Sequence, residues 1–137
     1  MPALTADRTT PKRRAARLSL PVAANAVIYA GALVCVSATG FATKGALSAT
    51  LKGAGVAQQR VDNTGGLDGA VRIEVDREGA HVFANSAAAD LITLADLGST
   101  VFVVDDQTVA KTSATSTRSA AGKVVDVDTT GVWISFV

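Results

Sequence analysis

The sequence is poor in the residues that usually carry reaction chemistry or covalent cross-links. Its 137 residues include one cysteine, one histidine, one tryptophan and one tyrosine, and aromatic residues make up only 4%. The single Cys35 cannot form an internal disulfide, and no Cys/His spacing suits a structural zinc site. We therefore expect no metal ion or other cofactor, and interpret Cys35, in the apolar run 32–36, as a small buried hydrophobic residue.

No group of residues has the pattern of a catalytic site. His81 has no nucleophile or carboxylate at a spacing that suggests a triad. Asp105 and Asp106 are neighbours, and neighbouring side chains of a strand point to opposite faces. The run 126–131 begins like a calcium loop, but its twelfth position is Val137, where a glutamate is needed. The sequence predicts turns at Asp105-Asp106 and at 126–131, and a surface or interface histidine in a strand at His81. It predicts no enzyme, although a small hydrolase or metal enzyme stays open as a third hypothesis.

The scarcity of aromatic residues also limits the core. Hydrophobic residues make up 48% of the chain, so a core must be built from Ala, Val, Leu and Ile. Each small side chain buries little area, at about 25 cal/mol per Å². We expect an isolated monomer of modest stability that gains from assembly with copies or partners.

Charge is divided unevenly along the chain. Residues 1–17 carry five basic side chains against Asp7, a net charge of +4, while residues 18–137 carry eight basic and eleven acidic side chains, a net charge of −3. All three prolines lie at or before position 21. Proline and mutually repelling charges favour an open chain, so residues 1–20 are predicted to form an extended arm that orders against a partner. The candidate contact residues are Arg8, Lys12, Arg13, Arg14 and Arg17.

The partner of this arm is open from charge alone. It could be an acidic protein groove, nucleic acid phosphates or a membrane face, or the arm could be a solvated tail. The overall charge of +1 and the lack of aromatics for base stacking argue against a specific nucleic-acid binder. An export signal is a further alternative, because a basic stretch precedes the apolar residues 18–36. Pro21, Asn25 and Gly31 interrupt that apolar stretch, which argues against a membrane anchor.

Residues 21–137 read as one β-rich body. Short β-favouring runs alternate with Gly, Asp, Asn and Thr. Residues 71–75 alternate strictly between apolar and charged residues, which is typical of a strand with one solvent-exposed face. Turns at 77–79 and 128–131 predict hairpins. The segment 93–98 predicts one short helical turn with a capping box, and 38–55 and 112–119 are expected to be surface loops. The expected strands are 27–30, 33–36, 56–61, 70–75, 80–84, 101–104, 109–112, 122–127 and 132–137.

This pattern predicts a mainly β fold, a small antiparallel β-barrel or sandwich with one short helical turn and an extended N-terminal arm. No internal repeat is visible at a solenoid period. Near the C-terminus, Trp133 and Phe136 are the candidate anchors of the core or of a subunit interface.

Read as a whole, the chain resembles the capsid decoration (cement) proteins of tailed bacteriophages, particularly those of Mu-like transposable phages. The resemblance rests on the order and spacing of β-and-turn stretches over nearly the whole chain. They are 28–34 followed by Gly40, 82–85 running into 92–98, and 101–109 closing with 121–128 and 131–133.

The resemblance implies a structural virion protein, a homotrimer with a β-barrel-like body on the outer surface of the phage head. It would be made in the host cytoplasm and would cement neighbouring major capsid subunits, with its N-terminal arm reaching across the shell. The implied partners are the major capsid protein and further copies of the chain, with no specific nucleic acid and no membrane. An exported β-domain with an N-terminal signal segment is the alternative.

Overall fold

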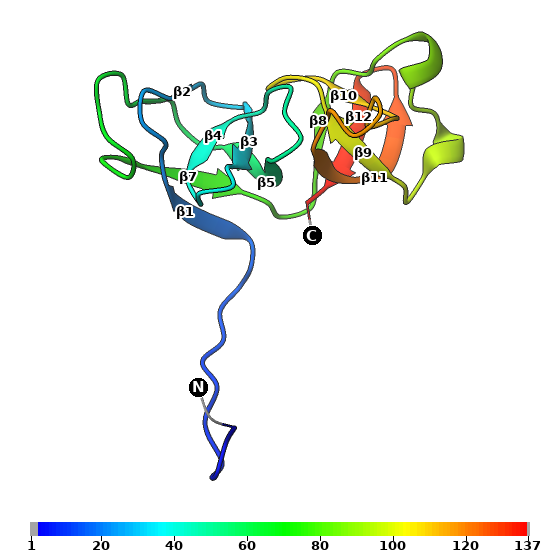
Figure 1. Ribbon diagram of the computed structural model, residues 1–137. Coiled ribbons are helices and arrows are strands. Elements are labelled where there is room, and N and C mark those ends of the chain that lie inside the picture. Colours follow the sequence, from blue (N-terminus) through cyan, green and yellow to red (C-terminus); the bar gives the residue numbers. More distant parts are fainter. Residues whose placement is uncertain (1–2, 137) are drawn as a thin grey trace.

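A computed structural model of the protein describes residues 3–136, and its regular secondary structure consists almost entirely of antiparallel strands (Figure 1). The mainly β prediction is confirmed, but the sheets are open and do not close into a barrel. The strands are β1 (Arg17–Pro21), β2 (Val27–Ile28), β3 (Leu33–Val36), β4 (Ala42–Lys44), β5 (Lys52–Ala57), β6 (Val61–Asp62), β7 (Arg72–Asp76), β8 (Ala80–Phe83), β9 (Thr100–Val103), β10 (Val109–Ala110), β11 (Ala120–Asp128) and β12 (Gly131–Ser135).

Two five-stranded sheets, one in each half of the chain, share one topology. The first has the order β1-β7-β5-β3-β4 and the second, read from its first strand, has the order β8-β12-β11-β9-β10. In each sheet the first strand of the half lies at one edge beside the last strand, and the second and third strands form the other side. A separate pair, β2 and β6, belongs to the first half. The body is therefore two similarly built halves, which the sequence did not reveal.

The similarity of the halves extends to an irregularity of register. In both sheets the ladder between the second and the fourth strand shifts by one residue at the same place. The paired residues are Val34–Gly55 and Cys35–Gly53 in the first half, and Val101–Gly122 and Phe102–Ala120 in the second. Bulges of this kind bend a strand and increase its twist, so both sheets are bent at equivalent positions.

The N-terminal arm is shorter than the predicted 1–20. Residues Arg17–Pro21 form β1, an edge strand that pairs along its whole length with β7. Leu20 packs against the core of the first half, while Arg17 and Ser19 are exposed, so β1 has the alternation of a half-buried strand. The prediction failed because the three residues between Arg17 and Pro21 are too few for that alternation to be recognised.

Two further expectations about the chain path are wrong. The predicted surface loop 38–55 contains β4 and most of β5. The turn at 77–79 does not close a hairpin, because β7 belongs to the first sheet and β8 to the second. The turn composition was read correctly, but it does not specify that the chain passes from one sheet to the next. The hairpin at Asp128–Gly131 is confirmed, since it joins β11 and β12.

The two halves share one of the two core clusters. Leu33 and Cys35 of β3 are fully buried together with residues of the second sheet, including Val103 and Ile134. Backbone contacts cross the same junction: the amide of Leu33 donates to the carbonyl of Asp106 at 2.8 Å. The prediction of a core built from small aliphatic residues agrees with both clusters, and Cys35 is buried as expected.

Two short 3₁₀ turns, η1 (Ala88–Asp90) and η2 (Leu94–Asp96), follow β8. The second turn lies inside the predicted helical segment 93–98 and has the predicted capping box. The hydroxyl of Thr93 accepts from the amide of Ala95 at 3.2 Å, and the carboxylate of Asp96 accepts from the amide of Thr93 at 2.9 Å. Both turns protrude from the second half at the end of the molecule away from the first (Figure 1).

Candidate functional site

The most prominent candidate for binding is the N-terminal arm. Residues 3–16 form neither helix nor strand, and Figure 1 shows this segment leading away from the body. Arg8, Lys12, Arg13 and Arg14 are all exposed. Arg17, the fifth predicted contact residue, is part of β1 and pairs with Asp76. The structure therefore brings the first four together on the arm and separates the fifth from them.

The arm is fixed to the body only near its base. The amide of Arg77 donates to the carbonyl of Ala16 at 2.9 Å, which extends the β1–β7 ladder by one residue. The guanidinium of Arg14 lies 3.2 Å from the carboxylate of Glu78, with both side chains largely exposed. Exposed pairs of this kind contribute little to stability, so the backbone bond between Ala16 and Arg77 defines where the arm leaves the body.

The two predicted anchors near the C-terminus lie on different faces. Phe136 is buried in the shared core, where its ring meets the ring of Phe83 edge-on at a centroid distance of 6.1 Å. Trp133 is only half-buried, on the face of β12 opposite to the buried Val132 and Ile134. The expectation of a core anchor therefore fits Phe136 and is wrong for Trp133, whose role at an interface stays a prediction.

Trp133 lies at the centre of an outer row of side chains. Its neighbours across the sheet are Asp126 of β11 and Val82 of β8. The indole Nε1 donates to the carboxylate of Asp128 at 2.9 Å, which fixes the ring plane. The ladder between β11 and β12 shifts at Val125, and this bulge leaves both Val125 and Asp126 exposed. We call Val82, Val125, Asp126, Asp128 and Trp133 the tryptophan face.

The carboxylate of Asp128 is held in its charged form. Hydrogen bonds from Thr130, and a further one from the Trp133 indole, lower the pKa of Asp128 below its ordinary value. The carboxylate of Asp126 accepts from the amide of Val127 at 2.8 Å and is exposed. The tryptophan face therefore combines an aromatic ring, two aliphatic side chains and two carboxylates.

A second apolar surface was missed in the sequence. Leu91, Leu94 and Leu97, in and around η1 and η2, are 45%, 59% and 58% exposed. Single exposed apolar side chains are normal on soluble proteins, but three large ones within seven residues of chain favour an interaction surface. The spacing of three residues was visible in the sequence, but a burial pattern could not be assigned without the path of the turns. We call these three residues the leucine loop.

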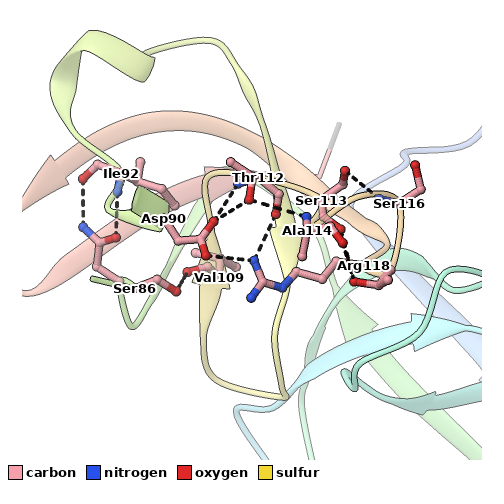
Figure 2. A network of polar contacts seen from close by, with 11 residues as sticks. Ser86, Asp90, Ile92, Val109, Thr112, Ser113, Ala114, Ser116 and Arg118 are labelled. Carbon is pink, nitrogen blue, oxygen red and sulfur yellow. Dashed lines mark hydrogen bonds and ion pairs between the residues drawn. The ribbon is translucent and has the colours of Figure 1, made fainter. Parts of the chain in front are cut away.

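Hydrogen bonds hold the leucine loop in place, as Figure 2 shows. The side-chain amide of Asn85 donates to the carbonyl of Ile92 at 2.8 Å, and its oxygen accepts from the amide of Ile92 at 3.0 Å. The carboxylate of Asp90 accepts from the hydroxyl of Thr112 and pairs with the guanidinium of Arg118 at 3.2 Å. The exposed leucines are therefore presented on a fixed framework.

The remaining polar candidates have structural partners. Asp105 accepts from the amide of Gln107 at 2.9 Å and so shapes the predicted turn. His81 lies in β8, as predicted, with its Nε2 atom 3.8 Å from the carboxylate of Asp76. Within residues 3–136, no three His, Cys, Asp or Glu side chains gather as metal ligands would.

No family model, no curated protein and no solved structure matches this chain. Among the residues described, no helix has the length and apolar character to cross a membrane. The function must therefore be argued from the surfaces of the chain itself, which are the arm, the tryptophan face and the leucine loop.

Proposed function

We propose that this chain is a structural virion protein that binds the outer surface of a tailed-phage head and cements neighbouring major capsid subunits, as a trimer. The observation that carries the proposal is the arm: a basic segment, exposed throughout residues 3–15, that continues an edge strand of a compact β body. The resemblance of the β-and-turn stretches to cement proteins gives the arm its context.

The arm is suited to long-range contact. Residues 4–16 span about 40 Å when extended, so they can reach well beyond the surface on which the body sits. Tethering makes the second of two linked contacts intramolecular, with an effective concentration in the millimolar range for a short linker. A modest contact of the body and a modest contact of the arm then add to a firm attachment.

The leucine loop supplies a surface for the body contact. Its three leucines are exposed on a framework fixed by Asn85 and Asp90, so little conformational entropy is lost when a partner covers them. We assign this loop to the contact between the body and the capsid subunits.

Deletion of residues 2–15 tests the arm. We expect the shortened protein to fold, because the deletion ends before β1, and to bind expanded, undecorated heads at least about 10-fold more weakly. Cosedimentation with purified heads measures this affinity. A matched control, Thr9→Ala with Thr10→Ala, changes the arm but keeps its charge, and should bind normally. Undiminished binding of the deletion variant would remove the arm from the mechanism.

Substitution of Leu94 and Leu97 by serine tests the body contact. Both side chains are exposed, so the fold should persist, while binding to heads should weaken. Leu67→Ser is the control, since Leu67 is 80% exposed but lies in the first half. Equal binding by the leucine-loop variant and the control would exclude this loop as the contact surface.

The alternative of an exported β-domain makes a different prediction about the mature chain. Cleavage after a signal ending near residue 36 would remove β1, β2 and β3, and with them the buried Val22, Ile28 and Leu33. Mass spectrometry of the mature protein distinguishes the two, because a retained start at Met1 or Pro2 excludes cleavage.

A further inference from the structure

The arm and the tryptophan face are complementary in charge and chemistry. Residues 12–14 of the arm are Lys-Arg-Arg, and the tryptophan face has two aspartates of β11, Asp126 and Asp128, next to one indole. Arginine stacks on tryptophan within about 6 Å and pairs with carboxylates through charge-assisted hydrogen bonds. An arginine-rich segment therefore matches both parts of this surface.

We propose that the tryptophan face of one copy binds the basic arm of a second copy, so that neighbouring copies are linked arm to body. The arm leaves its own body at the turn between β7 and β8, where Arg14 contacts Glu78 and Ala16 contacts Arg77. Figure 1 shows it running away from the strands that form the tryptophan face. A second copy offers the same acceptor surface, which is opposite in charge to the arm.

Charge also distinguishes this surface from a groove elsewhere on the body. A groove of about 330 Å³ at the junction of β5 and β11 is lined by Lys52 and Lys123 together with small and apolar residues. Two lysines would repel residues 12–14 of an arm. The tryptophan face, with two carboxylates and exposed aliphatic side chains, is the better acceptor.

The conformational freedom of both the arm and the tryptophan face is restricted before they meet, which favours the contact. Pro11 fixes one backbone angle directly before the Lys-Arg-Arg run, and the hydrogen bond to Asp128 holds the indole ring. Both features lower the conformational entropy that is lost when an extended segment binds. Trp133 is the single tryptophan, so its fluorescence reports the proposed contact directly.

Self-association of the full-length protein, without heads, tests the proposal. Analytical ultracentrifugation should show association that weakens with salt, because Coulomb attraction between exposed charges is screened. Asp126→Asn with Asp128→Asn should weaken this association by about 10-fold or more, as should Arg13→Gln with Arg14→Gln. Mixing the two double variants should restore a complex, because each retains the surface that the other lacks.

Asp62→Asn with Asp68→Asn is the matched control, since it makes the same change of charge on exposed residues of the first half. It should associate like the original protein. A synthetic peptide of residues 3–16 should change the Trp133 fluorescence and dissociate the assembly. The Asp126 and Asp128 variant should respond to this peptide only weakly.

Several outcomes would overturn the proposal. The first is a protein that stays monomeric at concentrations where the peptide has fully changed the Trp133 fluorescence. The second is an equal loss of association in the Asp126 and Asp128 variant and in its Asp62 and Asp68 control. The third is a Trp133 fluorescence that the peptide leaves unchanged. Head binding is measured separately, so a trimer that forms through another face would refute the arm-to-body link and leave the proposed function intact.

Discussion

Gly53 of β5 lies so close to the carbonyl oxygen of Ala121 in β11 that a Cβ atom at position 53 would collide with the backbone. This contact joins the two sheets, and the colliding group is backbone that cannot rotate away. A glycine is therefore required at the junction for steric reasons.

Replacing Gly53 by alanine should destabilise the protein by about 1–3 kcal/mol, the usual effect of overpacking. Urea unfolding measures the change. Ala120 occupies the equivalent position of the second sheet, and Ala120→Gly serves as control, with an expected loss of only about 0.5–1 kcal/mol. A Gly53→Ala variant as stable as the original would show that the halves adjust freely to each other.

The protein should become more stable when Ala114 is replaced by glycine. Ala114 has a backbone φ of 50°, in the left-handed region, as have Thr115 and Ser116 next to it. That conformation costs a residue with a Cβ about 1–2 kcal/mol. The gain in unfolded-state entropy from glycine offsets only about 0.4–1 kcal/mol of it. Ala114→Gly should therefore raise the melting temperature.

The same substitution elsewhere supplies the control. Ala49 lies in the corresponding loop of the first half and has no positive φ, so Ala49→Gly should lower the melting temperature. A higher melting temperature for Ala114→Gly and a lower one for Ala49→Gly would confirm the left-handed turn. A lower melting temperature for both variants would contradict it.

Acid should weaken the network around Asp90. Hydrogen bonds from Thr112, and then the contact with Arg118, lower the pKa of Asp90 below its ordinary value. A carboxyl group with a lowered pKa stabilises the fold above its unfolded pKa of about 3.9, and this stability is lost as the pH falls through the folded value. Asp90→Asn should thus be less stable than the original at neutral pH, with a difference that shrinks in acid.

Unfolding curves between neutral pH and strong acid measure this difference. Asp7→Asn, on the exposed arm, removes the same charge without touching the network and should leave the pH dependence unchanged. If the free energies of unfolding of the original protein and Asp90→Asn differed by the same amount over the whole pH range, the charged network would be excluded as the cause of the difference.

Alkaline pH should lower the stability of the fold through the thiol of Cys35. Burial raises the pKa of this thiol from 9.0 to about 12, so the folded protein retains a proton that the unfolded chain releases. Its contribution to stability is complete below the unfolded pKa and is lost as the pH rises from 9.0 toward about 12. Cys35→Val should reduce this alkaline loss.

The same burial predicts slow chemical modification of the thiol. A disulfide reagent should react with Cys35 at the rate of unfolding in buffer and at once in denaturant. Rapid reaction of the folded protein would contradict the buried position in β3.

The sequence predicts those parts of the fold whose residues alternate or turn strongly. Residues 71–75 were recognisable as a strand because Ile73 and Val75 face the core while Arg72 and Glu74 face water. The hairpin at Asp128–Gly131 was recognisable from its turn residues. In these places local chemistry alone determines the structure.

The rest depends on contacts that are distant in sequence. β5 contains Gly53, Ala54 and Gly55, which look like a loop. In the strand, Gly53 leaves room for the backbone of β11, and Gly55 leaves room for the backbone of β7. The position of Trp133 was equally hidden: an aromatic residue in an apolar strand suggests a core, and only the pairing of β12 shows that it faces outward. The basic arm was predicted from charge, and its end at β1 was not.

The shared strand order of the two halves has a consequence for assembly. A chain half as long would have to find a second copy before it could cover Leu33 and Cys35, and its pairing would depend on concentration. Joining two such units in tandem makes their association a property of one molecule. The connecting segments are not bound by this association, and they differ: β2 follows the first strand of one half, and the exposed leucines follow the first strand of the other.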